Sequence, residues 1–216
     1  MRYAVILLSL LFIAGCKTGK DKITITSEPS AYPLLDSAGT GKDFVLARRA
    51  EMNRFMETDS LSPFNAKGKV TFHPLRYFDY DSSFVFQSKL TRYPNPATVT
   101  ITGTKGEARQ VLAYGYLTIQ YGNNAHKLNV YQGNSKNYGI YYSIWLTDET
   151  TGSETYHVGR YLDFTPSMDP EYLYTLDFNM LYNPYCSYSD AYSCAVPGKE
   201  DHLPFAVRAG EKKFHD

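Results

Sequence analysis

Apolar and polar residues alternate along most of the chain after residue 69, and turn-forming residues interrupt the alternation at short intervals. Successive side chains of a strand point to opposite faces, so alternation with a period of two predicts strands with one buried face. The predicted strands cover residues 69–73, 84–90, 97–102, 109–121, 126–132, 139–147, 154–164 and 173–179, with a short one at 205–207. The gaps between most of them are short, which favours antiparallel neighbours because parallel strands need long crossovers.

One segment that precedes these strands has a helical period instead. Within residues 44–58, apolar residues recur on roughly one face of a helix, and charged residues occupy most of the remaining positions. These apolar residues are Val45, Met52, Phe55 and Met56. We therefore predict a mainly β fold, an antiparallel sheet system curled into a sandwich or partial barrel, with one N-terminal helix packed on one side. At this length, residues 44–216 are predicted to form a single domain.

The N-terminus is typical of an export signal. Residues 4–14 are apolar except for one serine, too short to span a membrane, which needs about 20 residues, but of the length found in signal peptides. They lead into Ile-Ala-Gly-Cys at 13–16, which resembles a bacterial lipobox. The sequence predicts a lipoprotein signal peptide at 1–15 and a membrane anchor of lipid on Cys16. The alternative is an ordinary secretory signal with a chance cysteine.

Residues 16–43 are rich in Lys, Thr, Ser, Gly and Pro and hold few large apolar groups. Such a composition buries too little apolar surface to offset the entropy of ordering, so a flexible tether is predicted. Lys17 stands where signals for inner-membrane retention often have an aspartate. The predicted location is the bacterial cell envelope, with the lipid in the outer membrane.

Charge and composition narrow the classes of partner. The chain has 22 Lys and Arg against 22 Asp and Glu, and this balance argues against a nucleic-acid-binding protein that relies on positive charge. Its 20 tyrosines have two interpretations. They could stack on sugars, or they could fill strands that have one face in water.

Polar residues in the last two predicted long strands form a candidate cluster. Its members are Glu154, Tyr156, Arg160, Asp163, Asp177 and Asn179. Alternation places Glu154, Tyr156 and Arg160 on one face of their strand, and Asp177 and Asn179 on one face of the next. The set could floor a shallow ligand site. Alternatively, a strand return near residue 168 brings Arg160 opposite Asp177 as an ion pair that organises the sheet.

Cys186 and Cys194 have three interpretations. A disulfide fits the extracytoplasmic location, a pair of buried free thiols is the second possibility, and half of a metal site is the third. The five histidines show no spacing typical of a zinc hydrolase, and no catalytic triad can be assembled from motifs. No metal and no cofactor are predicted, and catalytic activity stays undecided.

Several motifs in the C-terminal third occur together in one order. They are TGSETYHVGRYLD at 151–163, LDFN at 176–179, YNPYCSY at 182–188 and VRAGEK at 207–212. In these motifs the chain resembles DUF1684, a family of uncharacterised bacterial proteins. The segment after Cys194 lacks two prolines and an asparagine that the family usually has there. The resemblance implies kinship, and the family brings no established activity with it.

These observations lead to a functional hypothesis. We expect a lipid-anchored protein of the cell envelope that acts as a binding or scaffolding module for an unknown ligand or protein. The alternative is an envelope enzyme, such as a hydrolase, with a polar site around Arg160, Asp177 and Asn179. A deep pocket with convergent, unpaired polar groups favours the enzyme, whereas a flat aromatic surface favours binding.

Overall fold

The computed structural model describes residues 39–67, 70–135 and 139–215. The predicted signal peptide at 1–15, the predicted lipidation site Cys16 and most of the predicted tether lie outside these residues. No helix within the described ranges combines the length and the apolar character needed to cross a bilayer.

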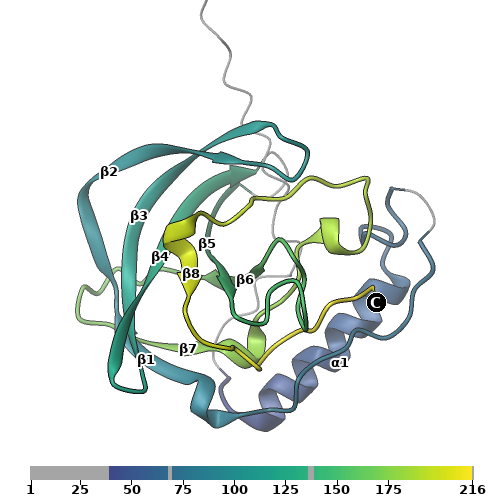
Figure 1. The fold of residues 1–216 in the computed structure, drawn as a ribbon, viewed down its shortest axis with the longest axis horizontal. Coiled ribbons are helices and arrows are strands. Elements are labelled where there is room, and N and C mark those ends of the chain that lie inside the picture. The colour runs from purple at the N-terminus through teal and green to yellow at the C-terminus, as the bar shows by residue number, and fades with distance from the viewer. Residues whose placement is uncertain (1–38, 68–69, 136–138, 216) are drawn as a thin grey trace, which may run out of the picture.

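The larger sheet has the strand order β2, β3, β4, β5 and β6, and every neighbouring pair in this order is antiparallel. The strands are β2 (Thr91–Thr102), β3 (Ala108–Tyr121), β4 (Asn124–Ser135), β5 (Gly139–Asp148) and β6 (Arg160–Phe164). The short β8 (His202–Leu203) lies parallel to β5. Figure 1 shows the long strands curving into a half-barrel. This curvature follows from the twist of long antiparallel strands.

A second, two-stranded sheet pairs β1 (Val85–Lys89) with β7 (Leu173–Asp177) in antiparallel register. One α-helix, α1 (Lys42–Thr58), lies across the molecule from the curved edge of the half-barrel (Figure 1). Within the part of the chain that the structure describes, four short 3-10 helices connect the remaining elements. They are η1 (Ser82–Phe84), η2 (Phe178–Met180), η3 (Tyr185–Ser187) and η4 (Lys199–Asp201).

The hairpin between β3 and β4 shows how local sequence sets the topology. Tyr121 pairs with Asn124, and the two residues between them turn the chain. Gly122 takes a φ of 60°, a left-handed conformation that costs glycine little and most other residues more. The sequence predicts this turn correctly, because the turn chemistry is local.

Apolar residues pack on both faces of the larger sheet. Ile144 and Leu146 of β5 point to a cluster that includes Phe178 and the β1–β7 sheet. Trp145, between them in sequence, points to the opposite cluster, where it meets Met52 and Met56 of α1. Opposite side-chain directions along one strand thus bury both faces of β5.

The predicted fold class is confirmed: the protein is mainly β, with a curled antiparallel sheet, a second small sheet and one α-helix in the described ranges. The helix begins at Lys42, two residues before the predicted start. Three predicted strands need correction. Residues 70–76 form no strand, residues 205–207 form none, and the strand predicted at 154–164 begins only at Arg160.

A compact turn replaces the first half of the strand predicted at 154–164. The carbonyl of Thr150 accepts hydrogen bonds from the backbone N–H groups of Ser153, Glu154 and Thr155, which coils this segment. Gly159 then takes a φ of 119°, and a Cβ there would lie 2.6 Å from the carbonyl oxygen of Leu146. The chain therefore becomes extended only after Gly159, although the apolar–polar alternation before it looks strand-like.

Candidate functional site

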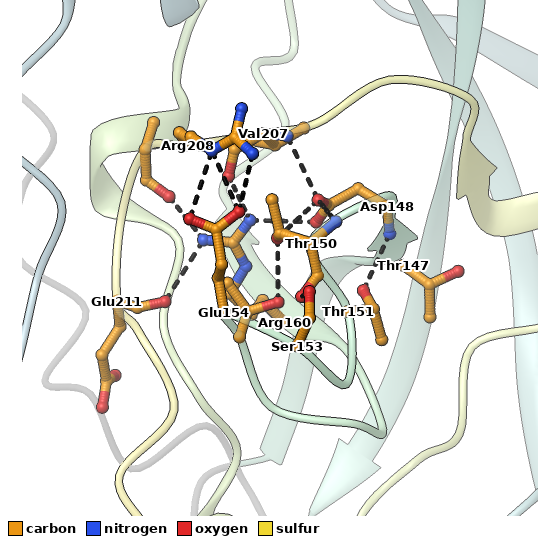
Figure 2. Close-up of polar contacts among 12 residues, drawn as sticks. Thr147, Asp148, Thr150, Thr151, Ser153, Glu154, Arg160, Val207, Arg208 and Glu211 are labelled. Atoms are coloured by element: carbon orange, nitrogen blue, oxygen red, sulfur yellow. Dashed lines mark hydrogen bonds and ion pairs between the residues drawn. The ribbon is translucent and has the colours of Figure 1, made fainter. Parts of the chain in front are cut away.

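Arg160 lies in a buried polar network that joins β6 to the C-terminal segment (Figure 2). Its Nη2 donates to Oδ2 of Asp148 at 3.0 Å and to the carbonyl of Val207 at 2.8 Å. Its Nη1 donates to the carbonyls of Ala209 and Glu211. The side chains of Arg160 and Asp148 are 0% and 1% exposed, so water does not screen this ion pair.

The predicted ion pair between Arg160 and Asp177 is therefore wrong. Residues 165–172 do not close a hairpin, because β6 pairs with β5 while β7 pairs with β1 in the other sheet. Burial lowers the pKa of Arg160, and the adjacent carboxylate of Asp148 opposes that shift. Asp148 is itself held, since its Oδ1 accepts from the backbone N–H groups of Thr150 and Val207. Arg160 thus has a structural role.

The other members of the predicted cluster on this segment lie apart from Arg160. Glu154 forms an exposed ion pair with Arg208 at 2.9 Å. Tyr156 donates its hydroxyl to the carbonyl of Cys186 at 3.1 Å. The structure thus does not bring Glu154, Tyr156 and Arg160 onto one strand face.

Cys186 and Cys194 are free thiols in this structure, so the predicted disulfide is not formed in it. The two cysteines are nevertheless adjacent, because the backbone N–H of Cys186 donates to Sγ of Cys194 at 3.2 Å. A hydrogen bond from Cys194 lowers the pKa of Cys186, whereas burial raises the pKa of Cys194. The disulfide stays a prediction for the oxidised protein.

The remaining cluster members line a pocket of about 500 Å³. One wall comes from α1, and the other comes from the end of β6, the loop after it, β7 and η2. The pocket contains Asp163, Asp177 and Asn179 of the predicted cluster. Alternation along β7 is as expected: Tyr174 and Leu176 are buried in the core, whereas Thr175 is exposed on the other face.

Arg49 of α1 is the pocket residue that sequence reasoning missed. Its Nη1 donates to the carbonyl of Phe78 at 2.8 Å, and its Nη2 donates to the carbonyl of Asn179 at 3.1 Å. Its guanidinium carbon lies 4.6 Å above the ring of Tyr77. Its Nε is buried and has no hydrogen-bond partner. Burial lowers the pKa of Arg49, and more distant carboxylates oppose this only in part.

A signal for Arg49 was present in the sequence. Val45 and Met52, both buried on α1, lie four residues before and three residues after it. A helical residue at that spacing shares a face with the buried ones. An arginine beside the apolar stripe is thus expected at the edge of the core, although the pattern does not identify the groups that contact its side chain.

Asp177 provides the opposite charge in the pocket. Its Oδ1 accepts hydrogen bonds from the backbone and side-chain nitrogens of Asn179 at 2.9 and 2.8 Å. Its Oδ2 is buried without a partner, and burial raises the pKa of this carboxyl group. Asn179 is fixed by two hydrogen bonds with the backbone of Asp81. Asp163 accepts from the hydroxyl of Tyr182 at 2.6 Å.

The chemistry available in the pocket is limited. Its described lining contains no histidine and no cysteine. Among the residues described, no three His, Cys, Asp or Glu side chains gather as a metal site. The pocket therefore offers hydrogen bonds, an arginine that forms no ion pair among the described residues, and aromatic and aliphatic walls.

The fold and the pocket define a β-rich protein with a small-molecule-sized cavity between its helix and its smaller sheet. The family described as "Protein of unknown function (DUF1684)" matches residues 70–212, and the chain belongs to this family. A search of the curated proteins finds no match. The solution NMR structure of an uncharacterized protein from Haloarcula marismortui is similar, with 27% identity and a TM-score of 0.59. The similarity covers 79% of this chain and 92% of that one.

Proposed function

We propose that this protein binds a small molecule in the pocket between α1 and β7, and that a lipid on Cys16 holds it in the cell envelope. The pocket is the observation that carries the binding function. Its volume of about 500 Å³ falls within the range of about 300–1,000 Å³ typical of ligand sites. The lipobox at residues 13–16 supports the location.

The pocket wall has the composition of a binding site. Apolar and aromatic side chains predominate, and a few polar groups from separate elements converge on it. Two of these groups, Nε of Arg49 and Oδ2 of Asp177, are buried without hydrogen-bond partners. Arg49 and Asp177 therefore give the pocket one cationic and one acidic side chain that form no ion pair among the described residues.

A pocket with converging polar groups was the outcome expected of the enzyme, but the residues that line this one favour binding, because its described lining holds no histidine and no cysteine. Arg160, expected in the floor of a catalytic site, lies outside the pocket, and its two terminal nitrogens donate to Asp148 and to backbone carbonyls. Asp163 and Asp177 are each held by neutral donors, Tyr182 and Asn179. The pocket favours a small-molecule site over a flat scaffolding surface.

The test uses 1-N-phenylnaphthylamine, a neutral dye that fluoresces in apolar pockets. Thr175 is exposed on β7 and lines the pocket, so Thr175→Trp should fill it. Thr98→Trp places the same side chain on exposed β2, outside the pocket, and serves as the matched control. We expect wild type and Thr98→Trp to bind the dye equally and Thr175→Trp to bind at least tenfold more weakly. Equal binding by all three proteins, or no binding by wild type, refutes the proposal.

A further inference from the structure

We infer that the pocket takes a single-chain amphiphile with an anionic head group, and that Arg49 binds the head. The inference rests on the proposed binding function and names the class of ligand. Two features support it: Arg49 lines the pocket without an ion pair among the described residues, and apolar side chains form much of the lining.

Two adjacent arginines line the pocket, and only one of them is neutralised. Arg48 forms an ion pair with Glu51 at 2.5 Å. Arg49 donates only to backbone carbonyls, and among the described residues no carboxylate lies within ion-pair distance of it. A buried cation is costly unless a counter-charge accompanies it. An anionic head group placed against the guanidinium of Arg49 would supply that charge.

The acidic residues of the pocket do not remove this preference. Asp163 is held by the hydroxyl of Tyr182, and Asp177 is held by the backbone and side-chain N–H groups of Asn179. Burial raises the pKa of Asp177, whereas the hydrogen bonds from Asn179 and the charge of Arg49 oppose that shift.

The walls and the rim suit an aliphatic chain. Core residues such as Leu162, Leu176 and Leu181 form part of the lining. At the rim, Tyr172 and Leu173 line the pocket and are 48% and 50% exposed. Exposed apolar residues gathered beside a pocket, rather than scattered singly, indicate an interaction surface. An acyl chain that enters over this rim would cover it.

Displacement of 1-N-phenylnaphthylamine from wild-type protein tests the inference with three ligands that share a ten-carbon chain. They are decanoate, 1-decanol and decyltrimethylammonium, used below their micellar concentrations. We expect decanoate to bind about tenfold more tightly than 1-decanol, because a hydrogen bond between two charged groups is stronger than one to a neutral hydroxyl. We expect the cationic ligand to bind most weakly.

Arg49→Met then removes the charge and keeps an apolar stem. In this variant decanoate should lose its advantage over 1-decanol, whose own binding should stay unchanged. Arg54→Met is the matched control, because Arg54 is exposed on the same helix and does not line the pocket. Asp177→Asn should strengthen decanoate binding, because it removes the opposing negative charge while an amide oxygen can still accept from Asn179.

The outcomes separate the two proposals. Equal affinity of wild type for decanoate and 1-decanol overturns the head-group inference and leaves the binding function intact. Tightest binding of the cationic ligand also overturns it and assigns the head group to Asp163 and Asp177. If the dye and all three ligands fail to bind, the proposed function itself is wrong. The wild-type ranking decides the inference even if Arg49→Met does not fold.

Discussion

Replacing Arg160 should destabilise the whole domain, because the residue holds the C-terminal segment against the sheet (Figure 2). Arg160→Met keeps most of the side-chain volume but removes the guanidinium. Asp148 then becomes a buried carboxylate without its ion-pair partner, and the carbonyls of Val207, Ala209 and Glu211 lose a donor. The change acts on the free energy of unfolding and does not touch the pocket.

The magnitude follows from the burial of the pair. Removing one partner of a buried ion pair costs about 3–5 kcal/mol, because the remaining charge is stranded in the interior. For a domain of about 150–250 residues, each kcal/mol lowers Tm by about 2–4 °C, so the expected loss is about 6–20 °C. The carbonyl groups of the C-terminal segment add to this only where water cannot reach them.

A double-mutant cycle followed by thermal unfolding measures the coupling. Arg160→Met and Asp148→Asn should each be strongly destabilising, and the double variant should lose much less than the sum of both. Asp177→Asn is the control with the same chemistry, and it should have a small effect because Asp177 forms no ion pair with Arg160. Additive losses, a Tm of Arg160→Met within about 2 °C of wild type, or equal effects of the two aspartate variants would refute the reasoning.

Three further predictions concern single groups. Burial raises the pKa of Glu211 from 4.5 to about 7, so the native state keeps a proton that the unfolded state loses. Urea unfolding should therefore show the free energy of unfolding falling by about 3 kcal/mol as pH rises from 4.5 to 7. Glu211→Gln should flatten that slope, and an unchanged slope would contradict the prediction. Cys186 and Cys194 should form a disulfide with oxidised glutathione and add about 2–3 kcal/mol of stability; two reactive thiols after oxidation, counted in denatured protein, would exclude it. Radiolabelled palmitate should enter wild type but not Cys16→Ser in the bacterial host, and equal labelling would rule out the anchor.

Much of the fold could be predicted because its determinants are local. The alternation in 109–121 and 126–132 and the turn between them define β3 and β4 within a few residues. The same rule placed Tyr174 and Leu176 of β7 in the core and Thr175 on the opposite face. Period and turn chemistry act over a few residues, so a single sequence contains them.

The strand partners could not be predicted in the same way. A short proline-containing connection at 165–172 was interpreted as a hairpin return, which made Arg160 and Asp177 neighbours. The structure instead sends the chain from one sheet to the other at this point. Alternation states which side of a strand is apolar, but it contains no information on which strand lies beside it. The identity of Asp148 as the ion-pair partner of Arg160 therefore depends on contacts between segments that are distant in the sequence.

The two buried arginines show why the site was harder to predict than the fold. Arg160 lies in the most motif-rich segment and inside the matched region 70–212, and the structure uses it to hold the fold. Arg49 lies outside that region, in a helix whose charged residues fall mostly away from the apolar face, and it lines the pocket without an ion pair among the described residues. The two arginines differ in their counter-ions: Asp148 lies 3.0 Å from Arg160, whereas no carboxylate within the described ranges contacts Arg49.

This division has a consequence for the family. The wall of the pocket formed by β6, β7 and η2 belongs to the matched region, whereas the wall formed by α1 does not. A pocket built from two such walls can keep its apolar floor while the helix supplies a different charge. The chemistry of the head group is therefore expected to depend on the residue at the position of Arg49, and the space for the chain is expected to depend on β7 and its neighbours.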